Sequence, residues 1–599
     1  MKKIYLTLIF SIMVTSTFSV KLKAAGKKYE GMTLTIFNVE DYISQGVDGS
    51  VDIISNFEEE YGVKVNYYTY DTNETMYNQF TLQKEGTYDL ICTSDYMIQR
   101  MIKEGLVEPM GDYKEHIPNY ENFAASVLRD KLKAMEVTLP SGKIVNLDEY
   151  AVGYMWGTLG IVYDPTCSDT IQEDVKSWDV FWDPTYKDLI SIKNSIRDAF
   201  VTGLMHSYSK SSAYQEAMYA YLDNPTIENC QRYNEMIQDI FDFKLDGSSE
   251  SDIENKEKIA KVKEELISMK KNIFGFEVDS GKNDIITGKI KLNLAYSGDA
   301  VYSISTASEH DITLEYYVPE DGSNIWYDAW TLPKGANREL AYLFLNYLSD
   351  PVNAADNMDY IGYTPYIVSD ELFTLTSTWY GAADYCVTTA YYAPVEEDLS
   401  DETLVIYHNI LYACIKDKES DEEIYPDNEE YFEKREYSDG EEYTEGDMVS
   451  YLGKIYNCTR DTTTSPNDES CWEENSGYDI GFLFSENLSK DRRAIIYPYY
   501  GSENQLETQY PSETIIARCA IMNDFGSYNE DVVIMWGQVK AYTNMIPVYI
   551  FLSVFLVVVV SGITFILIRR HILLKYKKRI AKKNTCLLYT SPSPRDGLL

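Results

Sequence analysis

Three consecutive stretches decide the fold: MTLTIFNV at residues 32–39, VDIISNFEEEY at residues 51–61 and VKVNYYTY at residues 63–70. The first and third are rich in β-branched and aromatic side chains, and this composition predicts strands. The second has apolar residues at the spacing of an amphipathic helix. A strand, a helix and a strand joined by short turns predict an α/β fold built on a mainly parallel sheet.

The same alternation continues along the chain. Residues 88–92 predict a third strand, and Ser94 caps the helix that follows it. Residues 151–163 (AVGYMWGTLGIVY) are apolar with interspersed glycines, which indicates an extended crossover between two lobes. Helical spacing covers residues 227–271, with an interruption near residues 246–249.

The composition narrows the function. With 599 residues the chain is too long for one simple core, so we expect two or more domains. The 95 acidic and 53 basic residues give a net charge of -42, which argues against nucleic acid as a partner because phosphate binding requires a basic surface. The acidity is compatible with a cationic ligand, and equally with a solvated surface that keeps the protein soluble.

The two ends predict the topology. Residues 1–25 have a basic start, a short apolar run and small residues at the end, as a secretory signal peptide does. Residues 546–568 form an uncharged apolar run that is long enough to cross a bilayer. The basic stretch at 569–585 follows, and the positive-inside rule places it in the cytoplasm. We therefore expect an extracytoplasmic protein anchored to the cell membrane by a C-terminal helix. Residues 586–596 (CLLYTSPSPRD) resemble the translation of a sequencing-library adapter, so we exclude residues 586–599 from the fold.

No motif of the serine hydrolase, zinc protease or P-loop type occurs in the sequence. The five histidines and nine cysteines show no metal-binding spacing. We therefore expect a binding protein that is not an enzyme and that needs no metal or cofactor. Cys458 and Cys471 are close enough in sequence to form a disulfide.

Four stretches place aromatic residues near the ends of predicted strands, most of them beside carboxylates: FNVEDY at 37–42, TSDY at 93–96, SNIWYDAW at 323–330 and IGYTP at 361–365. Ligands of open α/β sheets bind at the carboxyl ends of the strands. Aromatic faces hold alkyl chains and attract ammonium groups, and a carboxylate pairs with a terminal ammonium. The alternative is a set of packed aromatic rings with solvated acids beside them.

The order of several motifs resembles the substrate-binding protein of the bacterial spermidine/putrescine ABC importer. The motifs are EGTYDLICTSDYMIQRM at 85–101, WDVFWDPTYKDLI at 178–190, IWYDAWTLPKGA at 325–336 and YPSETIIARCAIMNDFG at 510–526. The resemblance implies a bilobed type II periplasmic-binding-protein fold, in which two α/β lobes close about a hinge and trap the ligand between them.

The resemblance and the composition together divide the chain. The expected segments are a signal peptide (1–25), lobe 1 (28–148 and 326–370), lobe 2 (149–325, 371–400 and 505–541), a small β-rich insertion (401–504), one transmembrane helix (546–568) and a basic tail (569–585).

The resemblance also implies a set of ligand-binding residues. They are Glu40, Asp41, Tyr42, Ser94, Asp95, Tyr96, Asp198, Tyr296, Trp326, Asp328 and Tyr363. Three positions depart from the family pattern: Val39 and Tyr296 replace tryptophans, and Met522 replaces a glutamine. One aromatic wall is therefore missing, whereas Trp326 and Asp328 remain, so a cationic amine still fits.

Part of the insertion resembles a second family. Residues 440–475, with YTEGDMVSYLGKIYNCTRDTTTSPNDESCW at 443–472, look like a small carbohydrate-binding module. Tyr443, Tyr456 and Trp472 would then form a flat face that stacks on sugars. The alternative is a short β module in which these aromatics are the core.

The expected function is therefore the solute-binding component of an ABC importer. It would bind a polyamine between its lobes and deliver it to a permease and an ATPase, which are expected either as separate chains or beyond the end of this sequence. Two alternatives stay open: the same fold binding ferric iron or another small solute, with Tyr391 and Tyr392 as iron ligands, or a surface protein that binds glycans through the insertion.

Overall fold

The computed structural model describes residues 28–588 apart from 112, 370–371, 373–374, 377–384, 392–394, 396–398, 401–402, 408–409, 420–423, 469, 476–477, 480–482, 484–491, 499–504 and 544–545. The predicted signal peptide therefore lies outside the described residues. The chain divides into two compact units, Met1–Val539 and Lys540–Leu599, and each is described here by itself.

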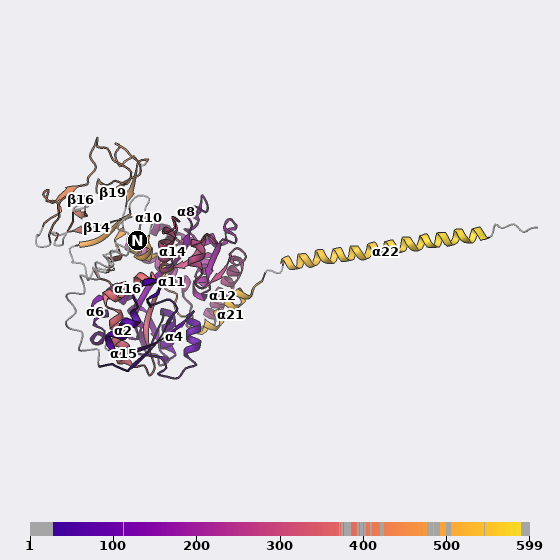
Figure 1. Cartoon of the computed structure of the whole chain (residues 1–599), viewed down its shortest axis with the longest axis horizontal. Helices are drawn as coiled ribbons and strands as arrows, with labels where there is room; N and C mark the ends of the chain where they lie inside the picture. Colours follow the sequence, from indigo (N-terminus) through magenta and orange to yellow (C-terminus); the bar gives the residue numbers. More distant parts are fainter. Residues whose placement is uncertain are drawn as a thin grey trace, which may run out of the picture. The chain divides into compact units, whose positions relative to one another are not determined.

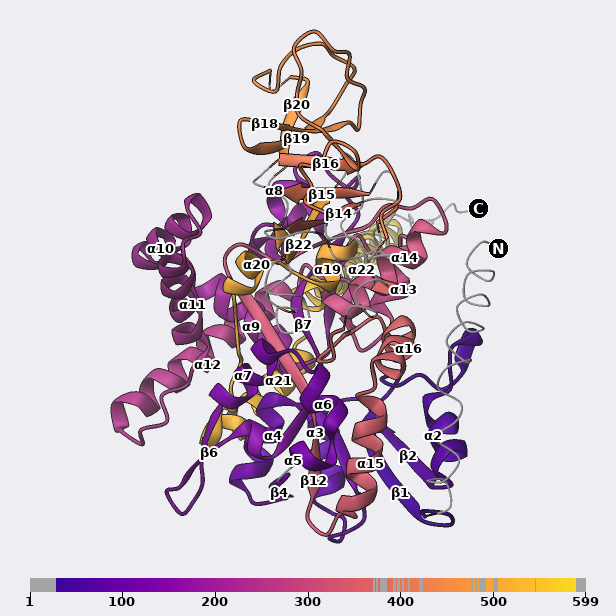
Figure 2. The same ribbon diagram turned by 90° about the vertical axis from the view of Figure 1, so that its left-hand side faces the viewer.

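The first lobe is built on a parallel sheet, as the opening stretches predict. Strand β1 (Thr33–Val39) lies between β2 (Lys64–Tyr70) and β3 (Leu90–Ser94), and both neighbours run parallel to it. Helix α2 (Ile53–Tyr61) connects β1 to β2, and α3 (Asn73–Phe80) connects β2 to β3. Figure 2 shows β1 and β2 side by side with α2 next to them. This strand–helix alternation confirms the α/β fold class.

Two long strands carry the sheet from the first lobe into the second. Strands β7 (Ala151–Tyr163) and β12 (Ser323–Pro333) pair antiparallel, and every residue of both strands is buried. Strand β12 also pairs with β3, whereas β7 pairs with β10 (Leu292–Tyr296). The predicted crossover at 151–163 is therefore β7, and it forms the centre of a sheet with the order β2-β1-β3-β12-β7-β10-β8-β9.

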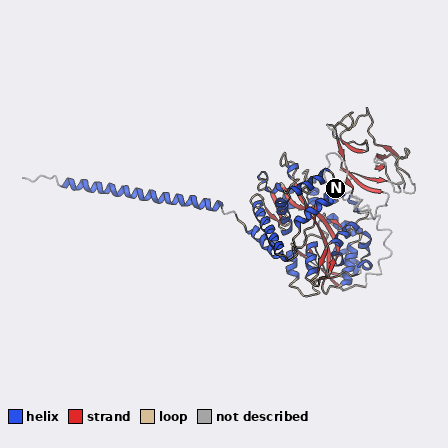
Figure 3. Ribbon diagram, turned by 180° about the vertical axis from the view of Figure 1, so that it is seen from behind, coloured by secondary structure: helices blue, strands red, loops and turns tan. Residues whose placement is uncertain are grey.

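The second lobe repeats the architecture of the first. Strand β8 (Ile190–Lys193) lies parallel between β10 and β9 (Gly275–Glu277). Its largest helices are α9 (Ile196–Tyr208), α11 (Ile227–Phe241) and α12 (Ser249–Met269), and the break between α11 and α12 falls at the predicted interruption. Figure 3 shows the strands in red with the helices in blue around them.

Each lobe has its own hydrophobic core. Leu34, Ile36 and Leu90 belong to the first core, and Trp178 and Phe200 belong to the second. Two segments late in the sequence return to this part of the fold: β23 (Cys519–Ala520) pairs with β12, and α21 (Asn529–Ala541) packs Val532, Met535 and Trp536 into the second core.

The pairing of β12 with β7 is irregular at one point. Asp328 lies opposite Met155, but the next residue, Ala329, lies opposite Gly153, so one residue of β7 is skipped. Such a bulge bends a strand locally and changes the direction of the side chains beside it. The irregularity therefore lies at an acid that the sequence assigns to the ligand site.

The described part of the insertion contains strands. A three-stranded sheet comprises β18 (Met448–Tyr451), β19 (Lys454–Cys458) and β20 (Trp472–Asn475), and Figure 1 labels β19 there. The disulfide suggested by sequence proximity is not formed. Both thiols are free, because Trp472 and not Cys471 lies opposite Cys458, whose Sγ donates to the carbonyl oxygen of Arg460 at 3.0 Å.

The second unit contains one continuous helix, α22 (Ile546–Leu588), drawn in yellow in Figure 1. Its residues Ile550–Lys583 are long and apolar enough to cross a membrane, and none of the most apolar window is buried within the protein. The predicted span at 546–568 lies within α22, and the basic stretch continues the same helix.

Candidate functional site

Four acids meet where strands end and helices begin. Glu74 lies in the first turn of α3, Asp95 begins α4 (Asp95–Lys103), Asp198 lies in the first turn of α9, and Asp299 lies in the first turn of α14 (Ser297–Ser308). The N-terminal ends of helices favour negative charge. The fold thus gathers carboxylates at the carboxyl ends of its strands, where ligands of such sheets bind.

Asp328 is a buried acid of the site, and one of its carboxylate oxygens can still accept a hydrogen bond. It lies on β12 opposite Ser94 and is 9% exposed. The hydroxyl of Tyr42 donates to its Oδ2 at 2.8 Å, and the Ser94 hydroxyl also interacts with the carboxyl and lowers its pKa, whereas no donor among the described residues makes a well-aligned hydrogen bond to its buried Oδ1. Burial raises the pKa of Asp328 to about 6. This carboxyl can therefore accept a hydrogen bond from a cationic donor.

Aromatic rings surround this acid. The Trp326 ring centroid lies 5.7 Å from that of Tyr296 at an interplanar angle of 75°, and 5.5 Å from that of Tyr363 at 60°. The Tyr42 ring lies 5.3 Å from Tyr363 at 85°. Aromatic faces hold alkyl chains and present a negative potential to ammonium groups.

Asp198 lies on the second-lobe side of these rings. It is 4% exposed, and its Oδ2 accepts a hydrogen bond from the hydroxyl of Tyr296. Burial raises the pKa of Asp198, and its charge in turn helps to raise the pKa of Asp328. The two carboxyl groups therefore interact electrostatically, one from each lobe, with the Trp326 ring and Tyr296 near them.

Asp95 is buried and held by the backbone. Its Oδ2 accepts from the amide of Tyr327 at 3.0 Å and its Oδ1 from the amide of Tyr96 at 2.5 Å. Burial raises its pKa to about 7. These two bonds fix the start of α4 against β12, so we interpret Asp95 as a residue that positions its neighbours.

Ser94 and Tyr96 complete the first-lobe side. The Ser94 hydroxyl accepts from the side-chain amide of Asn73 at 2.9 Å, and the Tyr96 hydroxyl donates to Glu74 at 3.1 Å. Asp41 and its neighbour Glu40 lie on an exposed turn after β1, and within the described part of the chain their side chains make no hydrogen bond or ion pair with the other site residues.

The structure adds residues that the sequence analysis did not select. Glu74 and Asp299 extend the acidic cluster, and two basic residues lie among the acids, Lys193 at the end of β8 and Arg197 in α9. Burial alone lowers the pKa of Lys193, but Asp299 and Glu277 outweigh it and raise that pKa above its usual value. Nothing in the sequence around Lys193 marks it, because its acidic partners Glu277 and Asp299 lie on other elements.

The aromatic residues expected to form a sugar-stacking face of the insertion are largely buried. Trp472 is 3% exposed and Tyr443 is 8% exposed, and their ring centroids lie 5.2 Å apart in a small core. The indole of Trp472 donates to the carbonyl oxygen of Thr464 at 2.9 Å, and Tyr456 is half-buried. Sugar stacking requires exposed rings, so this burial favours the alternative that the aromatics are the core of the module.

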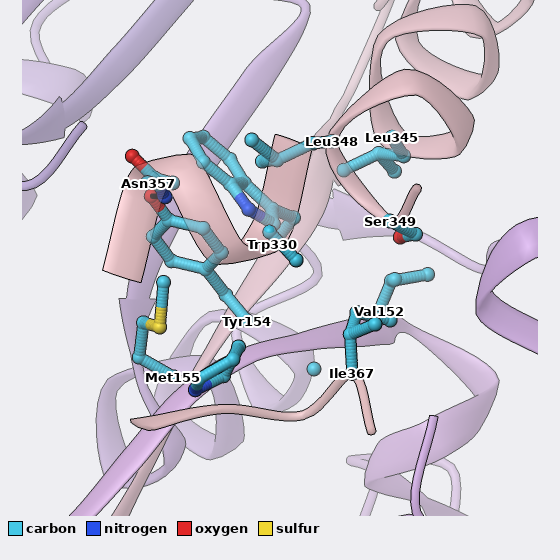
Figure 4. Close-up of a pocket in the computed structure, with 12 residues that line it drawn as sticks. Val152, Tyr154, Met155, Trp330, Leu345, Leu348, Ser349, Asn357 and Ile367 are labelled. Atoms are coloured by element: carbon cyan, nitrogen blue, oxygen red, sulfur yellow. Dashed lines mark hydrogen bonds between the residues drawn. The ribbon is translucent and has the colours of Figure 1, made fainter. Parts of the chain in front are cut away.

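A cavity exists elsewhere, within the first core. Figure 4 shows Tyr154, Trp330 and Asn357 around it, together with residues of α15 (Arg338–Leu348). Its volume of about 10 Å³ is about the space of one water molecule, too small for a ligand.

The described residues contain no group of three or more histidine, cysteine or acidic side chains arranged to hold a metal. Tyr392, named above as an iron ligand, lies outside the described residues.

Comparisons with known proteins identify the family of this chain and several of its relatives. A family model described as "Bacterial extracellular solute-binding protein" matches residues 52–370. The spermidine/putrescine-binding periplasmic protein of Salmonella typhimurium is 25% identical over 344 residues, which cover 57% of this chain and 80% of the relative. The putrescine-binding periplasmic protein of Pseudomonas aeruginosa is 25% identical over 340 residues, which cover 56% of this chain and 78% of the relative.

Among solved structures, the chain is similar to a spermidine/putrescine ABC transporter substrate-binding protein from Streptococcus pneumoniae. The identity is 25% and the TM-score 0.39, with 57% of this chain and 87% of that chain covered. The family and these relatives are solute-binding proteins and not enzymes.

Proposed function

Because this chain belongs to the bacterial extracellular solute-binding proteins, we propose that it binds a polyamine such as putrescine or spermidine and delivers it to an ABC importer. The ligand lies between the lobes, against the residues that the structure brings together from both. These residues are Tyr42, Asp198, Tyr296, Trp326, Asp328 and Tyr363.

One observation carries the proposal: Asp328 keeps a buried carboxylate oxygen to which no described donor makes a well-aligned hydrogen bond, beside the ring of Tyr42 and near that of Trp326. A buried charge is costly unless it is paired, so this oxygen favours a cationic donor. A charge-assisted hydrogen bond contributes about 1.5–3 kcal/mol. Each aromatic contact with an ammonium adds about 0.5–2 kcal/mol.

Three features support a membrane-tethered location outside the cytoplasm. The relatives are periplasmic proteins by name, α22 is apolar enough to span a bilayer, and basic residues follow its apolar part. Basic residues that flank a span remain in the cytoplasm. A tether would keep the binder next to its permease and raise its effective concentration there.

Titration calorimetry on the full chain in detergent tests the proposal. Putrescine and spermidine are titrated into the wild type, into Asp328→Ala and into Glu40→Ala, whose glutamate is exposed on the turn after β1. We expect saturable binding by the wild type and by Glu40→Ala, and a loss of at least about 100-fold in affinity for Asp328→Ala. Absence of heat with both amines in the wild type would refute polyamine binding.

A further inference from the structure

Several lysines of the second lobe gather at the end of its sheet that lies opposite the ligand site. Strands β8, β9 and β10 run parallel, and the site residues Asp198 and Tyr296 lie at or after the carboxyl ends of these strands. The loops that enter β9 and β10, at 270–274 and 287–291, carry four lysines and no acid in a chain with a net charge of -42. We call the lysines of these loops and the phenylalanine between them the basic surface: Lys270, Lys271, Phe274, Lys289 and Lys291.

An aromatic ring is exposed within the basic surface. Phe274 is 50% exposed, and the ammonium of Lys289 lies 4.9 Å from its ring centroid. Lys271, on the same loop as Phe274, is exposed as well. The two loops therefore lie side by side and present an apolar ring among positive charges.

The lysines outnumber the acids at this end of the lobe. Two of the four form ion pairs, Lys289 with Asp284 at 3.0 Å and Lys291 with Asp164 at 2.7 Å. The neighbouring loop before β8, at 187–189, adds one lysine and one aspartate. These three loops thus keep a positive balance after their acids and ion-pair partners are counted.

The segment that leads to the membrane helix leaves the second lobe at the same end. Lys270 donates from its Nζ to the carbonyl oxygen of Val539 at 3.1 Å, and the ring of Trp536 on α21 lies 4.9 Å from that of Phe276 on β9. Residues 540–545 alone separate Val539 from the start of α22. An extended chain covers at most about 3.5 Å per residue, so this connection reaches at most about 25 Å. A bilayer crossed by α22 would therefore lie within reach of the basic surface.

Resting on the membrane-tethered location proposed above, we propose that the basic surface docks on the anionic lipid headgroups of the membrane that α22 crosses. Lysines are attracted by the negative potential of such headgroups, and the ring of Phe274 inserts at the boundary between headgroups and acyl chains. The ligand site lies at the opposite end of the strands, so this docking turns the site away from the bilayer. The docked protein then captures solute from the outside, and it has to leave the lipid before it presents that solute to a permease in the membrane.

Lysine acylation in vesicles tests the docking. The full chain is reconstituted into vesicles of phosphatidylcholine with phosphatidylglycerol or of phosphatidylcholine alone, and mass spectrometry measures how fast a membrane-impermeant reagent acylates each lysine. Lipid contact covers Lys289, and the anionic surface keeps its amine in the charged, unreactive form. Its acylation should therefore be at least about threefold slower in the anionic vesicles than in detergent. Lys454 of the insertion is the matched reference, because it is also ion-paired and its side chain is 56% exposed, against 49% for Lys289.

A double variant removes the basic surface at exposed positions. Phe274→Ser combined with Lys271→Gln takes away the ring and one charge, so the acylation of Lys289 in this variant should be equally fast in anionic vesicles and in detergent. Leu82→Ser is the control, because this leucine of the first lobe is 85% exposed and lies outside the basic surface. The slowing should persist in that control.

Each outcome decides one part of the proposal. Equal acylation of wild-type Lys289 in anionic vesicles and in detergent overturns the docking, and equal slowing in phosphatidylcholine alone overturns the anionic headgroup as its partner. Calorimetry with putrescine in detergent reports the ligand site separately, and the double variant should keep the wild-type Kd. A chain that shows the slowing but binds neither amine overturns polyamine binding and leaves the docking standing, whereas a chain that does not float with the vesicles overturns the tether and the docking with it.

Discussion

Replacing Asp328 by asparagine should raise stability and lower affinity at once. Burial holds the pKa of Asp328 at about 6, above the ordinary value of 3.8. A shift of about two units corresponds to about 3 kcal/mol, by which the charged group destabilises the ligand-free fold. Asparagine has no charge, but its amide N–H then needs a partner, which reduces the gain to about 1–3 kcal/mol.

The sign of the pH dependence follows from the raised pKa. The folded state binds the Asp328 proton more tightly than the unfolded state does, so protonation of this group favours folding. The destabilisation develops as the pH rises from about 4 to about 6 and is complete above that range. The stability difference between Asp328→Asn and the wild type should therefore be largest at pH 7.5 and vanish near pH 4.

Two measurements check this prediction. Chemical unfolding of the ligand-free full chain gives the stability at both pH values, and calorimetry with putrescine gives the affinity. The variant loses a charge-assisted hydrogen bond, so its Kd should rise about 10- to 100-fold. Asp41→Asn is the control, because Asp41 is exposed and its φ of 53° suits asparagine. A variant that is less stable at pH 7.5 would refute the reasoning.

Three further predictions follow from single contacts. Below pH 6 the Kd for putrescine should rise about tenfold per pH unit, because protonation removes the charge of Asp328. Calorimetric titrations at pH 7.5, 6 and 5 measure this Kd, and a Kd that does not change with pH contradicts the prediction. Gly157→Ala places a Cβ 2.7 Å from Cζ2 of Trp326 and should weaken binding about tenfold by calorimetry, whereas Gly275→Ala meets no atom within 4 Å and should not. Trp472→Ala removes a buried ring and should destabilise the insertion by about 3–5 kcal/mol in limited proteolysis without changing the putrescine Kd; an intact module would show that the ring is not its core.

Local patterns sufficed for most of the fold. The predicted strand at 32–39 is β1, the crossover at 151–163 is β7, and the break near 246–249 separates α11 from α12. These elements are set by periodicity and turn residues within a few positions of each other, which a sequence displays directly. The motif at 178–190 does not show that its first part, Trp178–Trp182, is a 3-10 helix, which Pro184 keeps short.

The site was harder to predict because its contacts are long-range. Trp326 and Asp328 stand in a sequence motif, but the ion pair of Lys193 with Asp299 joins residues more than a hundred positions apart. Nothing near Lys193 in the sequence shows that a strand ends among acids. Likewise, the exposure of Glu40 depends on the turn after β1, which the motif FNVEDY does not encode.

The continuous strands β7 and β12 also govern how the protein loses its structure. Every residue of both strands is buried, and each strand contributes to both lobes. If one lobe unfolded alone, the part of β7 and β12 that packs in that lobe would lose its side-chain contacts and its hydrogen-bonded neighbour strands. The two lobes should therefore melt in a single cooperative transition, and damage to either one should abolish ligand capture by the whole binder.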